Sequence, residues 1–405
     1  MEKVRMAVIF DQQLQQGGGF QQAINAAQMP LRLSKDIVEI SFFTTIPGNV
    51  QVLLGYGISA KLIHFNLIQR AILYFRRLFA EPYTYRLISL VFPSRFENVL
   101  LKDGVDLVYF LSPTSWALDL NRLNYVTTIW DSCHRDHPEF PEVRVNREFE
   151  HRERIFHVLT RKAVAVISDS ELGKANLVRR YGIDADRVGV IPFRPSLNLI
   201  GSGDVSTQKS VEDIFEGFNI KVPYVFYPAQ FWPHKNHAYI LYAIAQLAKS
   251  RDPVAAVFCG SDKGCLEQVV SLAEHLGISH LVHYLGFVDS VTLRSLYLHS
   301  IALVMPSYFG PTNLPPLEAF SLGVPVMYSN LPGMREQVGD AAFLIDLSNP
   351  KSLASGIVSL RNDPELRRLL IERGFAKIKS INDQSDLEIM NDILARFRSK
   401  MLTWK

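Results

Sequence analysis

The chain of 405 residues contains only three cysteines, Cys133, Cys259 and Cys265. A small, odd number of cysteines excludes a disulfide-stapled scaffold and predicts a reduced protein. The sequence also lacks a basic segment followed by an apolar one at its start, as a secretory signal would have. We therefore expect a cytoplasmic protein.

Neither an excess of one charge nor a long apolar helix is present. Lys and Arg number 43 and Asp and Glu 40, and the resulting net charge of +3 is too small to indicate a nucleic-acid binder. The uncharged runs 40–60 and 300–317 are broken by Gly, Pro, Ser, Thr and Asn, so neither predicts a membrane span. The length and the 48% hydrophobic content fit a soluble protein of about two globular domains.

Short apolar runs recur along the chain, separated by longer helical patterns. Most runs are continuously hydrophobic, which is typical of strands buried on both faces of a parallel α/β sheet. The polar segment 201–219 separates two sets of runs. We predict two doubly wound, Rossmann-like domains facing across a cleft, over 1–200 and 220–385, with a helix over 386–405 packing back across the joint. The runs are 6–10, 37–43, 106–111, 126–130, 164–167, 188–191, 224–227, 254–259, 281–285, 301–305, 324–328 and 342–345.

In doubly wound sheets, ligands bind beyond the carboxyl ends of the strands, where the strand order switches. Polar or glycine-rich segments do follow the apolar runs, so we expect these segments to form the site. They are Gly17-Gly18-Gly19, 131–137, 168–170, 230–237 and 307–318.

The segment 307–326, SYFGPTNLPPLEAFSLGVPV, leads from a buried strand into a helix expected to start near Pro316. Backbone amides at the helix start, around 314–317, predict an anion site suited to a diphosphate. Glu318 is expected in the first turn, where a carboxylate can accept hydrogen bonds from the vicinal hydroxyls of a ribose. The alternative is that Glu318 only complements the helix dipole.

This segment resembles the donor-binding signature of family 4 glycosyltransferases, retaining enzymes with the two-domain GT-B fold. The signature has two glutamates eight positions apart ahead of a Gly-x-Pro-Val turn, matched here by 314–319 and 323–326. The resemblance assigns Glu318 to the nucleotide ribose. The first glutamate falls on Gly310, so its role of holding sugar hydroxyls has moved to Thr312 or Asn313 or is lost. The Phe-Gly-Pro-Thr-Asn loop resembles that of bacterial surface-polysaccharide mannosyltransferases.

The segment 224–237, YVFYPAQFWPHKNH, resembles the strand and loop in which that family grips the leaving diphosphate with an arginine and a lysine. Lys235 matches the lysine, and Gln230 stands at the arginine position. A single lysine can neutralise phosphate charge as a point charge. The loss of the arginine would weaken this grip unless Arg194 or Arg335 substitutes for it.

Other donor contacts are implied by the same resemblance. Gly260 falls in a glycine-containing turn, and the main chain at Phe287 and Val288 would meet the nucleobase. Gly17-Gly18-Gly19 resembles the loop that approaches the donor phosphate, although three glycines are also a common flexible turn. The donor-binding residues are thus Gly17, Gly18, Gly19, Gln230, Lys235, Gly260, Phe287, Val288, Thr312, Asn313, Leu314 and Glu318.

The segment 129–138, IWDSCHRDHP, resembles the family's His-Asp loop, which reaches the sugar. Trp130 stands at the histidine position and cannot accept a proton. Asp131 and His134 are therefore the candidates for contacting the sugar 6-hydroxyl or the acceptor hydroxyl. The alternative is that Asp131 caps the next turn and His134 is a surface residue.

Residues 56–100 carry six basic and two acidic side chains. Their helical spacing places apolar residues on one face. One interpretation is a core-facing amphipathic helix, and the other is a surface that meets anionic lipid at the inner face of the cell membrane. The apolar residues are Phe65, Ile68, Ile72, Phe75 and Phe79.

The function that follows is a retaining, metal-independent glycosyltransferase with Asp131, His134, Lys235 and Glu318 in catalysis. It would move a hexose from a nucleotide-diphosphate sugar, with GDP-mannose favoured and UDP- or dTDP-sugars as alternatives. The acceptor would be a glycan or lipid-linked oligosaccharide in surface-polysaccharide synthesis, and no cofactor is expected besides this donor.

Two rival functions remain open. The departures from the signature permit a catalytically degenerate GT-B scaffold that binds a nucleotide sugar or a partner. The short motifs His134-x-x-His137 and His234-x-x-His237 also permit a metallohydrolase, although each is weak as a metal site.

Overall fold

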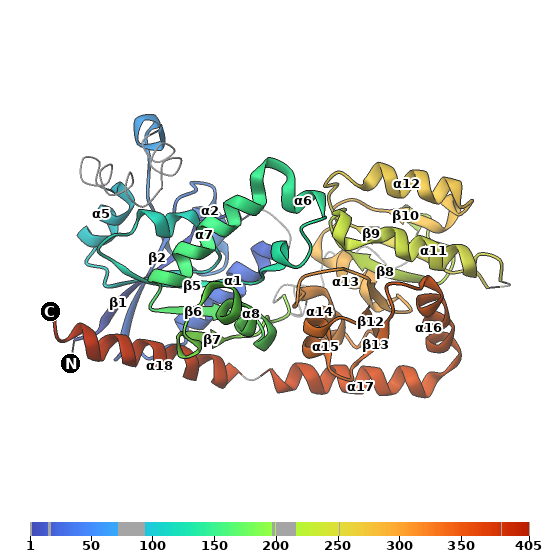
Figure 1. The fold of residues 1–405 in the computed structure, drawn as a ribbon. Helices are drawn as coiled ribbons and strands as arrows, with labels where there is room; N and C mark the ends of the chain where they lie inside the picture. Colours follow the sequence, from blue (N-terminus) through green and yellow to red (C-terminus); the bar gives the residue numbers. More distant parts are fainter. Residues whose placement is uncertain are drawn as a thin grey trace. The chain divides into compact units, whose positions relative to one another are not determined.

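The computed structural model of the chain describes residues 2–14, 18–71, 94–196, 199, 216–250, 252–381 and 383–404. The chain divides into two compact units (Figure 1). The first unit comprises Met1–Ser132, Phe149–Pro192 and Asn382–Lys405, and the second comprises Cys133–Glu148 and Phe193–Ile381.

The first unit contains a seven-stranded parallel sheet in the order β3-β2-β1-β4-β5-β6-β7. Consecutive strands run outward in one direction from β1 to β3 and in the other from β4 to β7, so the switch point lies between β1 and β4. The strands are β1 (Val4–Phe10), β2 (Val38–Thr44), β3 (Ala60–Leu62), β4 (Leu107–Phe110), β5 (Asn124–Thr128), β6 (Ala165–Ser168) and β7 (Val188–Val190).

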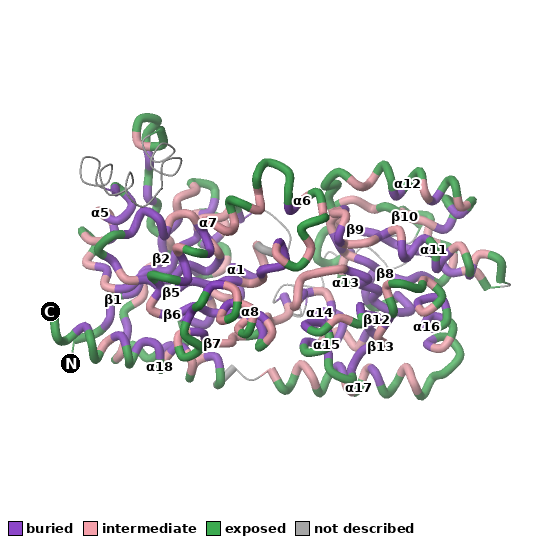
Figure 2. The backbone as a smooth tube through the Cα atoms, viewed as in Figure 1, coloured by how far each residue is buried: buried purple, intermediate pink, exposed green. Residues whose placement is uncertain are grey.

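Helices cover both faces of this sheet, which explains why its strands are continuously apolar (Figure 2). One apolar cluster packs the sheet against α1 (Gly18–Leu31), α2 (Asn49–Gly55) and α18 (Asp383–Met401). The other packs it against α5 (Arg95–Lys102), α7 (Glu148–Lys162) and α8 (Glu171–Tyr181).

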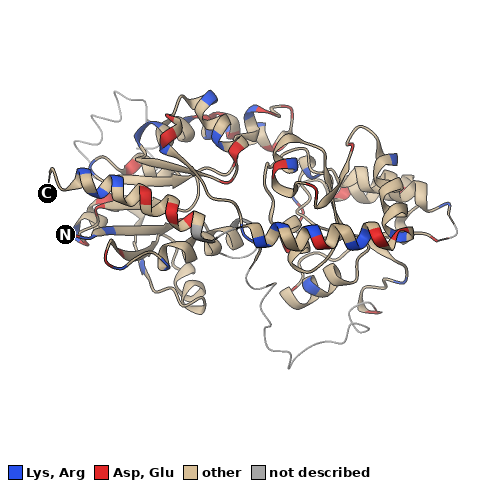
Figure 3. Ribbon diagram, turned by 90° about the horizontal axis from the view of Figure 1, so that it is seen from below, with Lys and Arg blue, Asp and Glu red and all other residues tan. Residues whose placement is uncertain are grey.

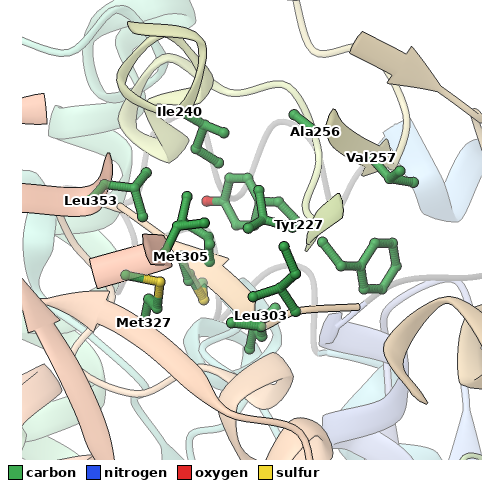
Figure 4. Packing of buried hydrophobic residues seen from close by; sticks show 14 of the residues in the cluster. Tyr227, Ile240, Ala256, Val257, Leu303, Met305, Met327 and Leu353 are labelled. Carbon is green, nitrogen blue, oxygen red and sulfur yellow. The ribbon is translucent and has the colours of Figure 1, made fainter. Parts of the chain in front are cut away.

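The second unit contains a six-stranded parallel sheet in the order β10-β9-β8-β11-β12-β13, with its switch point between β8 and β11. A single core surrounds it, and the phenol of Tyr227 lies in that core with Ile240, Met305 and Leu353 (Figure 4). The strands are β8 (Tyr224–Pro228), β9 (Ala255–Cys259), β10 (Val282–Tyr284), β11 (Leu303–Met305), β12 (Val326–Ser329) and β13 (Ala342–Ile345). The helices are α6 (Pro141–Arg144), α11 (His237–Leu247), α12 (Leu266–His275), α13 (Ser290–Leu298), α14 (Leu314–Ser321), α15 (Pro332–Val338), α16 (Pro350–Asn362) and α17 (Pro364–Ser380).

The predicted fold class, two parallel doubly wound sheets, is confirmed, and each apolar run contains a strand. The short edge strand β3 was not predicted, because it falls inside the segment interpreted as a basic helix. In that segment Phe65 is buried but precedes the helical residues 67–71, whereas Ile68 is 72% exposed, so the two do not share a buried face. The remainder of the expected helix, 72–93, lies outside the described residues.

The unit boundaries differ from the predicted ones: the second unit runs from Phe193 to Ile381 and the first resumes at Asn382, where domains over 1–200 and 220–385 were expected. Residues Cys133–Glu148 were expected in the domain 1–200 but group with the second unit. At the carboxyl end of the chain, α18 contributes Met390, Leu394 and Phe397 to the core of the first unit. Most of the predicted linker 201–219 lies outside the described residues.

Acidic and basic side chains are interspersed along α17, whereas in α18 the acidic ones lie in the first half and the basic ones near the end (Figure 3). Arg368, for example, pairs with Glu365 at 2.8 Å and with Glu372 at 2.6 Å. Among the described residues, no helix is long and apolar enough to cross a membrane.

Candidate functional site

Gly260 allows the loops after β8 and β9 to meet at the carboxyl edge of the second sheet. Its φ is +148°, and a Cβ there would lie 2.4 Å from the Ala229 carbonyl oxygen. Phe231 N donates to Ser261 O at 3.1 Å and Gly260 N donates to Gly286 O at 2.8 Å, so three loops are joined at this point. A side chain at Gly260 would therefore force this edge of the sheet apart.

We expect Gly260→Ala to destabilise the chain by about 1–3 kcal/mol, because both the backbone conformation and the Ala229 contact become strained. The melting temperature in differential scanning fluorimetry checks this. The control is Gly55→Ala, where a Cβ meets nothing within 4 Å and φ is not positive, so stability should hold or rise slightly. Equal melting temperatures for the two variants would contradict the close approach.

Lys235, at the end of the short 3-10 turn η6 (Pro233–Lys235), is held close to the start of α14. Its Nζ donates to Asn313 Oδ1 at 3.3 Å, and its carbonyl accepts from the Tyr227 hydroxyl at 3.0 Å. That hydroxyl also bonds Ser307 Oγ at 3.0 Å. Two of the predicted donor residues, Lys235 and Asn313, are thus in direct contact.

Asn313 is locked in place by a network of hydrogen bonds. Its backbone N donates to Gln337 Oε1 at 3.0 Å, and Gln337 Nε2 donates back to Asn313 O at 2.6 Å. Asn313 Nδ2 donates to Gly310 O at 2.9 Å and to the Tyr328 hydroxyl at 2.6 Å. Both groups of the Asn313 amide are therefore engaged, and a sugar hydroxyl would have to share its oxygen with Lys235.

Gly310, which stands where the signature has its first glutamate, adopts a φ of +93°. This is a conformation that favours glycine over any other residue, and a Cβ there would lie 3.4 Å from the Asn313 amide. A glutamate at this position would therefore be held in a strained backbone conformation. The neighbouring predicted contact, Thr312, is half-buried.

The start of α14 differs from the prediction. The helix begins at Leu314, two residues before Pro316, and its second and third residues are both prolines. Pro315 and Pro316 have no N–H, and the amide of Asn313 already bonds Gln337. The expected anion site of amides around 314–317 is therefore reduced, and Leu314 N is the first-turn amide left to serve it.

Glu318 lies in the second turn of α14, not in the first as expected. Because the dipole effect fades beyond the first turn, the interpretation that Glu318 only complements the dipole is wrong. Its carboxylate is buried and accepts hydrogen bonds from Ser196 Oγ and, at 2.8 Å, from the Tyr297 hydroxyl. Burial raises the pKa of Glu318, and these two hydrogen bonds only partly oppose the shift.

The other predicted donor contacts of the second unit lie on its edge loops. Gln230 Oε1 accepts from Trp232 Nε1 at 3.0 Å, so Trp232 orients the side chain at the arginine position. The ring of Trp232 also lies 5.8 Å from Lys263 Nζ, a cation that the sequence motifs did not indicate. Phe287 is 59% exposed in the loop after β10, and Val288 is half-buried beside it.

The predicted residues before position 150 fall in different parts of the structure. Gly17 lies outside the described residues, and Gly18 and Gly19 begin α1. Asp131 belongs to the first unit and pairs with Arg152 of α7 at 3.4 Å. His134 belongs to the second unit and is fully buried, so the alternative that it is a surface residue is wrong.

The histidines of the possible metal motifs have other environments. His234 Nδ1 lies 2.6 Å from Glu142 Oε1. His237 is buried and stacks on Phe231 with ring centroids 4.2 Å apart, and burial lowers its pKa to about 3. Within the described residues, no three His, Cys, Asp or Glu side chains are grouped so that they could hold a metal ion.

Residues 210–377, all in the second unit, match the family described as "Glycosyl transferases group 1". The chain is 27% identical over 265 residues to O-antigen chain mannosyltransferase B of Escherichia coli, covering 64% of this chain and 66% of the relative. It is 26% identical over 261 residues to D-inositol 3-phosphate glycosyltransferase of Corynebacterium efficiens, covering 62% and 59%. The chain thus spans less than two thirds of the length of these curated relatives.

The fold is similar to that of solved glycosyltransferases. Anabaena HepE, crystallised in complex with UDP and glucose, superposes with a TM-score of 0.73 at 17% identity, over 97% of this chain and 100% of that one. The resemblance found in the sequence is confirmed: residues 210–377 match the group 1 glycosyltransferases, and the chain has the GT-B fold. The relatives are named as transferases, which does not favour the non-catalytic scaffold.

Proposed function

We propose that this chain transfers a hexose from a nucleotide-diphosphate sugar to a hydroxyl of a glycan or lipid-linked oligosaccharide, with retention of configuration and without a metal. The observation that carries this proposal is the contact of Lys235 Nζ with Asn313, which directly precedes the helix that carries the buried carboxylate of Glu318. A cation from one loop beside a helix start that carries a carboxylate acceptor matches the diphosphate and the ribose of such a donor.

Lys235 would stabilise the negative charge that gathers on the diphosphate as the bond from the sugar carbon to the phosphate oxygen breaks. The new bond from the acceptor oxygen would form on the same face of the sugar. The acceptor proton would pass to the leaving phosphate oxygen, so no separate protein base is needed. Asp131 and His134 stay candidates for holding sugar or acceptor hydroxyls, and His134 would require its neighbours to move.

GDP-mannose is the donor we favour, because one relative is named as an O-antigen chain mannosyltransferase, and surface-polysaccharide synthesis is the corresponding pathway. UDP-sugars are the main alternative, because the structural neighbour HepE was crystallised with UDP and with glucose. dTDP-sugars form a third class with the same diphosphate.

We expect one of these three donor classes to raise the melting temperature most when GDP-mannose, UDP-glucose and dTDP-glucose are compared at millimolar concentration. A ligand at a hundred times its Kd stabilises a protein by about 2.7 kcal/mol. The absence of a shift with every donor and nucleoside diphosphate would contradict the proposal.

Donor hydrolysis, measured on the same sample, distinguishes an enzyme from a non-catalytic scaffold. With donor and no acceptor, an enzyme releases free nucleoside diphosphate slowly, whereas a scaffold binds without release. Proton NMR of the product of a reaction with acceptor then reports whether the anomeric configuration is retained.

A further inference from the structure

The segment Cys133–Glu148 of the second unit contacts two loops of that unit that carry predicted donor residues. It contains the 3-10 turn η2 (Cys133–Arg135) and the short helix α6 (Pro141–Arg144). Its contacts fall on His234, directly before Lys235, and on residues 308–310, directly before Thr312 and Asn313. None of the family motifs in the sequence assigns a role to the part of this segment beyond His137.

Glu142 is the polar anchor of the segment. Its Oε1 accepts two hydrogen bonds from one residue, His234, from the backbone N at 3.1 Å and from ring Nδ1 at 2.6 Å. The side chain of Glu142 is only 9% exposed and that of His234 only 11%. Burial alone would raise the pKa of Glu142, but hydrogen bonds from His234 and from its own backbone together outweigh burial and lower the pKa.

Aromatic contacts hold the same loops together. The ring of His234 stacks on Phe309 with centroids 3.9 Å apart and planes 16° apart. His137 lies against Phe309 at 5.8 Å and 20°, and Phe140 meets Phe309 edge-on at 5.5 Å. Phe309 therefore contacts one histidine from the η6 turn and one from the 133–148 segment.

His234 is connected through the backbone to the residues predicted to bind the donor. Tyr308 N donates to His234 O at 2.9 Å, which ties the turn after β8 to the loop after β11. Lys235 is the next residue, and its Nζ reaches Asn313 at the end of the second loop. A shift of His234 would thus move both the cation and the residue that it contacts.

We propose that Glu142 is a positioning residue for donor binding: by accepting hydrogen bonds from the backbone N and the ring Nδ1 of His234, it fixes Lys235 and the 308–313 loop in the geometry that a nucleotide diphosphate requires. Glu142 does not itself touch the donor. This inference rests on the proposed function, because it concerns the same diphosphate site.

The test compares Glu142→Ala, Glu142→Gln and Glu139→Ala in calorimetric titration with GDP and UDP and in steady-state transfer. Glu142→Ala is expected to weaken nucleoside diphosphate binding and to raise the donor KM about tenfold. Glu142→Gln keeps an oxygen that can accept from His234, so it should restore most of the affinity. Glu139 is the matched control: it bonds His137 at 3.2 Å on the same segment but is 67% exposed, and its loss should leave the donor KM unchanged.

A Glu142→Ala protein with wild-type nucleotide affinity and donor KM, whatever its melting temperature, would overturn the inference, because a purely structural role predicts that result. If Glu142→Ala does not fold, Glu142→Asp withdraws the carboxylate by one methylene, and a donor KM within twofold of wild type would overturn the inference equally. Failure of the proposed function is distinct, since the wild-type protein itself would then bind none of GDP, UDP and dTDP.

Discussion

Lys235→Ala is expected to lower kcat/KM for the donor about a hundredfold, equivalent to about 2.7 kcal/mol of transition-state stabilisation. Lys235 is the cation that contacts the start of α14, and Gln230 at the arginine position is neutral. Pro315 and Pro316 remove two helix-start amides that would otherwise share the task. Because few other groups can donate hydrogen bonds to the phosphate oxygens, the loss of this ammonium group should lower kcat/KM strongly.

The measurement is the rate of nucleoside diphosphate release in the presence of acceptor, with the donor chosen from the melting-temperature comparison. The fold should survive, because Asn313 keeps its hydrogen bonds to Gly310, Tyr328 and Gln337. The control is Lys249→Ala, which changes the net charge equally. Lys249 lies just beyond the far end of α11, about 16–18 Å along the helix from the site. A Lys235→Ala enzyme within threefold of wild type would remove Lys235 from the mechanism.

The fold could be predicted from the sequence because its strands are buried on both faces, and continuous apolar runs such as 254–259 carry that signal directly. The edge strand β3 carries no such signal, since its three residues are partly or fully exposed. The boundary of the units was also missed at Cys133–Glu148. That segment is held in the second unit by contacts such as Glu142 with His234, 92 residues apart in the chain.

The candidate site was predicted only as far as local motifs reach. Lys235 and Asn313 were indicated by their own segments, and the structure brings them into contact. The sequence did not indicate that the backbone amide of Asn313 at the helix start is already hydrogen-bonded, because its partner Gln337 belongs to another helix. The positive φ of Gly310 likewise shows that this backbone would strain a glutamate, which a single sequence cannot reveal.

Glu318→Gln is expected to separate activity from stability. A carboxylate that accepts from charged or ribose donors contributes about 1.5–3 kcal/mol per bond, so its replacement should lower nucleotide affinity and kcat/KM by tenfold to a hundredfold. The folded protein should hold or gain stability at pH 7, because the buried charge is removed while Gln still fits between Ser196 and Tyr297.

The pH dependence gives the sharper test. Because burial raises the pKa of Glu318 above its ordinary value of about 4.5, the group contributes its full stability to the fold at pH values below that unfolded-state value. This contribution is lost as the pH rises through the folded-state pKa. Any gain in melting temperature of Glu318→Gln over wild type should therefore shrink as the pH is lowered from 8 towards the unfolded pKa of about 4.5.

Protonation of Glu318 favours the folded state, but it should weaken nucleotide binding. In the wild-type protein the nucleotide affinity should fall as Glu318 takes up its proton, whereas in the variant this loss should be absent. Glu274→Gln, an exposed carboxylate on α12, should change neither property. A wild-type affinity that stays level as the pH falls through the Glu318 pKa would mean that the ribose does not bind this carboxylate.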